Sequence, residues 1–337
     1  MEKINLFKSN PKDIRLIKTI TKDSYCSNWI DNIFALFKSI NNILYLIYTS
    51  QENDIISYNL EDKKKILKIK KAHNLGIINL IHYLDILNKR DLIISISGND
   101  NNLKLWNIDN WECILNIKNM ENGTMHTGNI FNSNNQLYIL ISNELFCNTQ
   151  LMKVFDLKGN LIKEINKSNE DTYIIETYYD DKLSKSFILT GNYGYVKSYD
   201  YNENKLYHIY EENDVDYNMH KSLRIYKNNS IINLIESSSD GNIRIWNFHK
   251  NILLKKIFVS QKGLCGICFW NNQLLFVGCN DKTMRLLDIN EGKIIKHIDD
   301  SNYGIVAIKK IIIPQYGECL ITQGHFNYQI QLWAIPK

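Results

Sequence analysis

The sequence predicts an all-β fold, a seven-bladed β-propeller of four-stranded antiparallel blades, and three observations favour it. Short strand-like segments with a large apolar residue near their end recur every 41 to 49 residues, a period typical of four-stranded blades. Each of the first six repeats contains four strand-like segments. The seventh repeat lacks only its fourth segment. The recurring large residues are Tyr58, Trp106, Phe155, Tyr199, Trp246, Leu287 and Trp333.

Each repeat unit divides into four strands, which we call a, b, c and d in chain order. The segment around each recurring residue, such as 243–247, alternates apolar and polar side chains as a strand does. An apolar run that ends in small or polar residues precedes it (274–281, for example), and another strand follows it (252–258). Asn pairs such as 41–42 mark tight turns. No window has a sustained helical period, so we expect very little helix.

The two ends of the chain are expected to meet. The seventh unit stops after its strand c, and residues 13–20 look like the d strands of the other units. A propeller with an open blade would leave unpaired strand edges, which closure of the ring removes. We therefore predict that the N-terminal strand completes the last blade and that 1–337 forms a single domain.

Composition and charge exclude several classes. The chain has 337 residues, 44% of them apolar, with 40 basic against 36 acidic residues and a net charge of +4. Such a balance argues against a protein that coats nucleic acid. Seven scattered cysteines are typical of reduced thiols. Neither a secretory signal nor a run of about 20 apolar residues occurs. We expect an intracellular protein, cytoplasmic or nuclear, with no membrane span.

The second and fifth units carry a spacing of His, Asp and Trp. Asp100 precedes Trp106 by six residues and follows His73, and Asp240 precedes Trp246 by the same interval. With these residues the chain resembles the WD-repeat (Trp-Asp repeat) β-propellers over nearly its whole length. The resemblance implies a buried structural network of His73, Asp100 and Trp106 with Ser97 or Ser95, and a second one of His220, Asp240 and Trp246. At the position of the Asp, the first, third, fourth and seventh units have Glu52, Thr149, Tyr193 and Asn327.

Few patterns indicate catalysis or a cofactor. Cys265 and Cys268 form a CxxC, but it has no second ligand pair nearby, so we interpret both as small buried apolar residues and expect no metal. None of the common hydrolase, zinc or phosphate-loop motifs occurs. We therefore expect no enzyme and no cofactor. The lysines between Lys63 and Lys71 are interpreted as a solvated edge strand, with a phosphate or RNA contact as the alternative.

The loops that join strand d to strand a, and strand b to strand c, share one face of a propeller. They carry a net charge near −12, and large aromatic side chains lie among the acidic ones. Carboxylates beside aromatic rings are suited to Lys and Arg side chains. The acidic candidates are Glu211, Glu212, Asp214 and Asp216, and the aromatic candidates are Trp29, Tyr193, Tyr217, Tyr303, Phe326 and Tyr328.

The leading functional hypothesis is a non-catalytic protein–protein interaction scaffold that binds a partner peptide, one with Lys or Arg, on this acidic face. The alternative is a structural subunit of a larger multiprotein complex that docks through the blade rims. A propeller enzyme and an RNA or phosphoinositide binder are further alternatives, which the sequence favours less.

Overall fold

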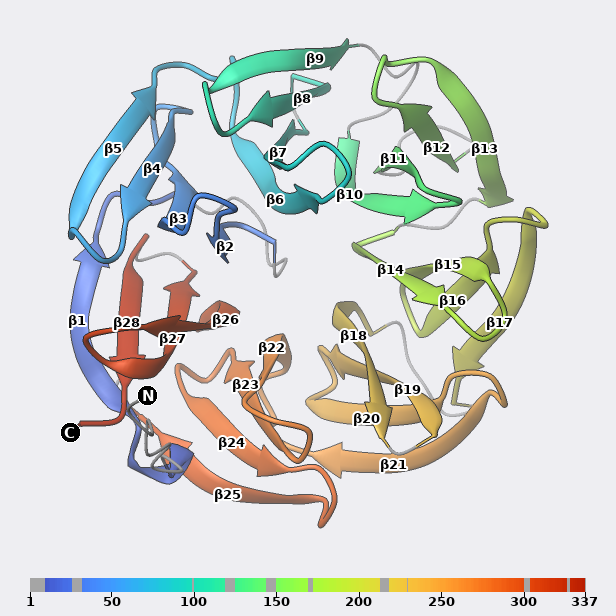
Figure 1. Ribbon diagram of the computed structural model, residues 1–337. Helices are drawn as coiled ribbons and strands as arrows, with labels where there is room; N and C mark the ends of the chain where they lie inside the picture. The colour runs from blue at the N-terminus through green and yellow to red at the C-terminus, as the bar shows by residue number, and fades with distance from the viewer. Residues whose placement is uncertain are drawn as a thin grey trace, which may run out of the picture.

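The computed structural model describes residues 10–25, 32–98, 100–118, 125–143, 150–168, 172–212, 218–228, 230–299, 304–325 and 328–336. Its strands form seven four-stranded antiparallel sheets arranged around a central axis (Figure 1). The predicted seven-bladed propeller is therefore confirmed. In each blade, strand a is nearest the axis and strand d forms the rim. A short 3₁₀ helix, Pro11–Asp13, is the one helix among the described residues.

Blades 1 to 4 follow one another along the chain. Blade 1 comprises β2 (Ala35–Lys38), β3 (Leu44–Thr49), β4 (Ile55–Asn59) and β5 (Lys64–Ile69). Blade 2 comprises β6 (Ile77–Asp85), β7 (Arg90–Ser97), β8 (Asn102–Asn107) and β9 (Glu112–Lys118). Blade 3 comprises β10 (Met125–Ser133), β11 (Gln136–Asn143), β12 (Gln150–Asp156) and β13 (Leu161–Ser168). Blade 4 comprises β14 (Ile174–Asp180), β15 (Lys185–Gly191), β16 (Tyr195–Asp200) and β17 (Lys205–Glu211).

The last three blades complete the ring. Blade 5 comprises β18 (His220–Asn228), β19 (Ile231–Ser238), β20 (Asn242–Asn247) and β21 (Ile252–Phe258). Blade 6 comprises β22 (Leu264–Phe269), β23 (Leu274–Cys279), β24 (Met284–Asp288) and β25 (Lys293–Ile298). Blade 7 comprises β26 (Ile305–Ile313), β27 (Gly317–Gly324), β28 (Ile330–Ala334) and β1 (Arg15–Thr21).

Ring closure follows the prediction. β1 pairs antiparallel with β28, and the register places Leu16 opposite Trp333 and Thr19 opposite Gln331. Strand d of blade 7 therefore comes from the beginning of the chain (Figure 1).

The core consists of seven hydrophobic clusters among the described residues, one between each pair of neighbouring blades. Strand b contributes side chains to the clusters on both sides of its blade. In β3, Leu44, Leu46 and Tyr48 pack toward blade 7, whereas Tyr45 and Ile47 pack toward blade 2. Successive side chains of a strand point to opposite faces, so a strand buried on both faces reads as a continuous apolar run.

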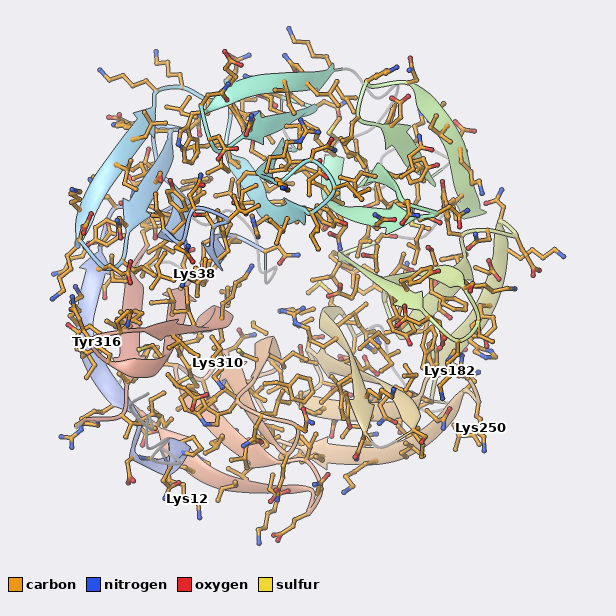
Figure 2. The ribbon with its side chains drawn as sticks, viewed as in Figure 1. Lys12, Lys38, Lys182, Lys250, Lys310 and Tyr316 are labelled. Carbon is orange, nitrogen blue, oxygen red and sulfur yellow. The ribbon has the colours of Figure 1, made fainter. Side chains whose placement is uncertain are left out.

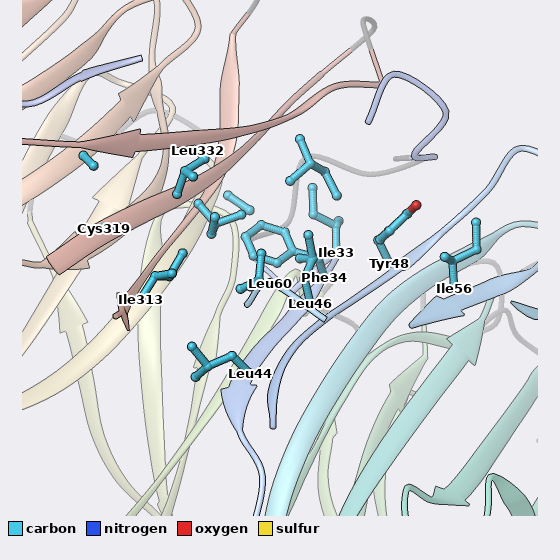
Figure 3. Close-up of a cluster of buried hydrophobic side chains, with 14 of the residues drawn as sticks. Ile33, Phe34, Leu44, Leu46, Tyr48, Ile56, Leu60, Ile313, Cys319 and Leu332 are labelled. Carbon is cyan, nitrogen blue, oxygen red and sulfur yellow. The ribbon is translucent and has the colours of Figure 1, made fainter. Parts of the chain in front are cut away.

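The cluster between blades 7 and 1 joins the end of the chain to its first complete blade (Figure 3). Phe34 and Leu46 of blade 1 are fully buried there with Leu332 of β28 and Ile321 of β27. Ile17 and Ile20 of β1 are partly buried against the same cluster. Closure thus combines a strand ladder with apolar burial.

A β-bulge lies at the same place in every blade, opposite the recurring large residue of strand c. In blade 2, Leu105 pairs with Leu115 and Trp106 with Cys113, which leaves Ile114 as the extra residue. Such a bulge bends a strand and increases its twist, so the outer strand can follow the rim. The extra residues are all apolar or aromatic: Ile17, Ile66, Ile114, Ile162, Tyr207, Leu254 and Ile295.

We predict that a disulfide between β1 and β28 will stabilise the ring. Thr19 and Gln331 are directly opposite in the register, within the reach of a disulfide in an antiparallel pair. A Thr19→Cys/Gln331→Cys variant should cross-link on oxidation and gain up to about 5 kcal/mol in unfolding free energy, because the closed loop is long. Denaturant unfolding of the oxidised and reduced forms measures the gain. Thr19→Cys alone is the control, and absence of the cross-link would contradict the β1–β28 register.

Candidate functional site

The polar network of blade 2 runs through Ser95. Trp106 Nε1 donates to Ser95 Oγ at 2.8 Å, and His73 Nε2 lies 2.7 Å from the same oxygen. His73 Nδ1 faces Asp100 Oδ2 at 3.5 Å, and Asp100 also accepts the backbone N–H of Asn74. The structure thus brings His73, Asp100 and Trp106 together.

Ser97 was the wrong one of the two serines for this network. Its side chain points to the same sheet face as that of Ser95 but is two residues nearer the loop. There its hydroxyl donates to the carbonyl oxygen of Leu75 at 3.1 Å. Ser97 therefore anchors the d–a loop and does not bridge the Trp to the His.

Burial decides the charge of the His73 ring. Ser95 Oγ accepts the Trp106 N–H and lies within hydrogen-bond distance of His73 Nε2, while His73 Nδ1 faces Asp100. Burial lowers the pKa of His73 to about 4, although Asp100 acts in the opposite direction. The imidazole is therefore neutral at neutral pH, and the pair is not an ion pair.

Blade 5 has a different network from the one implied by its sequence. His220 Nδ1 contacts Glu236 Oε2, and Trp246 Nε1 donates to Glu236 Oε1 at 3.1 Å. Asp240 instead binds the guanidinium of Arg244. The prediction that Asp240 joins His220 and Trp246 directly was wrong, because the buried Glu236 carboxylate, in the register position of Ser95, offers one oxygen to each ring.

The acceptor for the Trp N–H has a constant register position. The acceptor residue lies two positions after the strand b residue that pairs with the Trp, and it is Ser95, Glu236 or Thr322. In blade 7, Trp333 Nε1 donates to Thr322 Oγ1 at 2.8 Å. Units with Phe155 or Leu287 in place of Trp have Ile141 or Val277 there, which accept nothing. A buried N–H needs an acceptor, so a comparison of the units in register could have found Glu236 and Thr322.

Most described carboxylates of the d–a/b–c face are matched by cations. Lys68 lies 2.7 Å from Asp54 and 3.4 Å from Glu52, and Arg285 binds Asp281. Glu212 lies 2.6 Å from Arg244 and 2.8 Å from Lys256. Burial raises the pKa of Glu212, but hydrogen bonds from Lys256 and Arg244 outweigh it and lower the pKa overall. Glu212 is thus a partner in an ion pair within the protein. The net charge summed over the loops does not include the lysines and arginines of the strands, so it overstates the negative charge of this face.

Two pairs of tyrosines contact each other on the d–a/b–c face, and the members of each pair come from different loops. Tyr25 and Tyr328 are stacked, with ring centroids 6.0 Å apart, and the Tyr328 carbonyl accepts both the backbone N–H and the hydroxyl of Ser24. Tyr328 has φ +52°, a left-handed conformation that is unusual for a bulky residue. Tyr193 contacts Tyr173 edge-on at 4.9 Å and has 37% of its surface exposed.

The remaining candidates lie outside the described residues, apart from Glu211, which is exposed at the end of β17. They are Trp29, Asp214, Asp216, Tyr217, Tyr303 and Phe326.

The axis contains a polar cavity of about 200 Å³. Its wall includes Asn129, Glu176, Arg224 and Lys309 from four different a strands. Arg224 lies 3.5 Å from Glu176, and Lys309 Nζ donates to Asn32 Oδ1 at 3.4 Å.

The CxxC cysteines lie in β22, where Cys265 is fully buried and its sulfur is 3.0 Å from Asn280 Oδ1, while Cys268 is partly buried. Within the described ranges, no group of three or more His, Cys, Asp or Glu side chains is placed to hold a metal ion. In the same part of the chain, no helix is long and apolar enough to cross a membrane.

Comparison with known proteins gives no assignment: no protein-family model matches the chain, and no curated protein does.

We predict that Ser95→Ala destabilises the fold. The change removes the acceptor of the Trp106 N–H and the hydrogen-bond partner of His73 Nε2 in a dry interior, which should cost about 1–3 kcal/mol. Ser57→Ala is the matched control, because Ser57 is equally buried but its hydroxyl has no hydrogen-bond partner among the described residues. Chemical denaturation measures both variants; equal losses would contradict the network.

Stability should fall as the pH drops below about 6.5. Burial lowers the pKa of His73 and His325 to about 4 and that of His220 to about 3, whereas an unfolded His titrates near 6.5. Between these values the unfolded chain binds more protons, so each group contributes a loss of about 1.4 kcal/mol per pH unit. Unfolding free energies at several pH values should show a shallower slope for His73→Gln than for the wild type. An unchanged slope would contradict the neutral, buried imidazole.

Proposed function

We propose that this chain is a non-catalytic protein-interaction scaffold of the WD-repeat type, and that it binds a Lys- or Arg-containing peptide segment of a partner on the d–a/b–c face. A propeller offers a rigid ring on which loops from all blades converge, and such scaffolds commonly carry function in their loops. The His73–Ser95–Trp106 network supports the WD-repeat part of the proposal.

The observation that carries the peptide-binding part is the pair of aromatic groups between loops of different strands. Tyr25 follows β1 and Tyr328 precedes β28. Their rings stack although the two residues are far apart in the sequence. Ser24 holds the strained Tyr328 backbone through two hydrogen bonds. Strain of this kind is found at sites where geometry matters for binding. Aromatic faces attract ammonium and guanidinium groups.

Charge gives a second argument for a basic partner. The segments of this face that lie outside the described residues contain acidic residues and no Lys or Arg. Four cations of the strands already have acidic partners: Lys68 pairs with Asp54, Arg244 with Glu212 and Asp240, Lys256 with Glu212, and Arg285 with Asp281. The acidic residues of those segments are Asp31, Glu121, Glu144, Glu170, Asp171, Asp214, Asp216 and Asp300.

The rim remains a second candidate surface for docking into a larger complex. β21 exposes Ile252, Leu254 and Phe258 on one side of an outer strand. Leu254 is the extra residue of the blade 5 bulge, so the twist of the strand accounts for part of this exposure.

The peptide proposal predicts a preference for basic sequences. An array of short peptides with one Lys or Arg, paired with versions that have Gln or Glu at that place, is the probe. The wild type should retain the basic set, and retention should weaken as salt rises. Tyr328→Ala, Tyr193→Ala and Glu211→Lys should each reduce retention several-fold, because they remove aromatic area or charge.

Tyr179→Ala is the matched control. Tyr179 is exposed to a similar extent, 44%, but lies near the end of β14, toward the opposite face. Retention that is independent of the basic residue, or equal loss with Tyr179→Ala, would contradict the proposal.

A further inference from the structure

A groove of about 590 Å³ lies between blades 4 and 5 on the face opposite the d–a/b–c loops. The a–b turns of both blades and the c–d turn of blade 5 line it. Its volume is in the range of pockets that bind ligands of peptide-side-chain or drug size. We call it the tyrosine groove, because Tyr178, Tyr179, Tyr207 and Tyr226 line it together with Leu183, Ile225 and Ile232.

Hydrogen bonds between the two blades fix the floor of the tyrosine groove. The Tyr207 hydroxyl lies 3.1 Å from His249 Nδ1, and His249 Nε2 lies 2.9 Å from Asp180 Oδ2. Asp180 also accepts the backbone N–H groups of Lys182 and Leu183. Tyr207 and Asp180 belong to blade 4 and His249 to blade 5, so the floor is a preorganised surface that ties the blades together.

The wall of the groove exposes apolar side chains to solvent. Tyr179 at the end of β14 and Leu183 in the turn that follows are exposed by 44% and 50%. Tyr226 also lines a smaller cavity of about 220 Å³ between blades 5 and 6, where Ile231 and Leu254 are exposed. Apolar surface therefore continues across the blade 5 hairpin from one cavity to the next. Contiguous exposed apolar surface of this kind marks interaction sites.

Exposed lysines lie at the edge of the groove. Lys182 and Lys227 line it and are exposed, and Lys250 directly follows the lining residue His249 (Figure 2). Asp181 is the exposed carboxylate of the lining. Asp180 is buried and directs its oxygens to three N–H groups of its own chain. Lysines therefore outnumber the carboxylates that face solvent at the rim.

We propose that the tyrosine groove binds a short peptide segment of a partner protein in which large apolar side chains are flanked by Asp or Glu. The apolar side chains would lie on the tyrosine floor beside Leu183, and the acidic ones would pair with Lys182, Lys227 and Lys250. Interaction hot spots usually combine rigid aromatic side chains with surrounding charges that are complementary to those of the partner. This surface adds to the basic-peptide site on the opposite face and does not depend on it.

Selection from a random short-peptide display library against the full chain tests this proposal. Peptides selected by the wild type should include a class rich in Leu or aromatic residues next to Asp or Glu. Leu183→Glu should weaken that class by at least about tenfold, since it places a charge in the apolar wall. Lys182→Glu/Lys227→Glu should weaken it similarly and shift a new selection toward Lys and Arg.

Matched controls separate binding from folding and from the opposite face. Leu161→Glu changes an equally exposed leucine, 49%, on the rim of blade 3. Lys65→Glu/Lys70→Glu reverses two exposed lysines, one in β5 and one directly after it. Both controls and Tyr193→Ala should retain the class, with unfolding midpoints like those of the groove variants. A selected pool that ignores Leu183→Glu, or groove-dependent peptides without acidic residues, would overturn the proposal, whatever the array shows for the d–a/b–c face.

Discussion

The antiparallel pairing of β1 with β28 is the constraint on which the ring depends. A blade buries both of its faces, so each one needs two neighbours, and a ring satisfies this requirement for every blade at once. Without β1, the outer edge of β28 would be unpaired, and the cluster that holds Phe34, Leu46 and Leu332 would lose its rim (Figure 3). The entropy lost in joining the two chain ends is large, and it is offset by one strand ladder and by apolar burial on both sides of blade 7.

Burial on both faces has a second consequence, which concerns polar groups. A Trp N–H in the interior needs an acceptor, and three blades supply it with different residues of strand b. Blade 2 has Ser95 and blade 5 has Glu236, while blade 7 has Thr322. Buried charges are paired in the same way. Arg244 neutralises carboxylates from two different loops, so the interior ion pairs reduce the acidic charge that the loops present to solvent.

The two faces of the ring differ in chemistry. The d–a/b–c face combines stacked tyrosines with loops rich in carboxylates, whereas the a–b/c–d face between blades 4 and 5 combines a tyrosine floor with lysines. A scaffold with two such surfaces would hold a basic and an acidic segment on opposite sides of one rigid ring. The network of His249, Asp180 and Tyr207 contributes to that rigidity, because it ties neighbouring blades at their turns.

The sequence by itself determined the number of blades, the strand order and the closure by residues 13–20, because strand alternation and turn residues are local properties that repeat. The resemblance to WD-repeat units, carried by the spacing of Asp100 from Trp106, predicted that these residues meet His73, and they do. The tertiary structure decided the rest. Ser95 rather than Ser97 bridges the network because of sheet register, and Glu212 meets Arg244 from another blade. The tyrosine groove exists only where turns of two blades, distant in sequence, lie side by side, and such proximity is set by packing that no local pattern encodes.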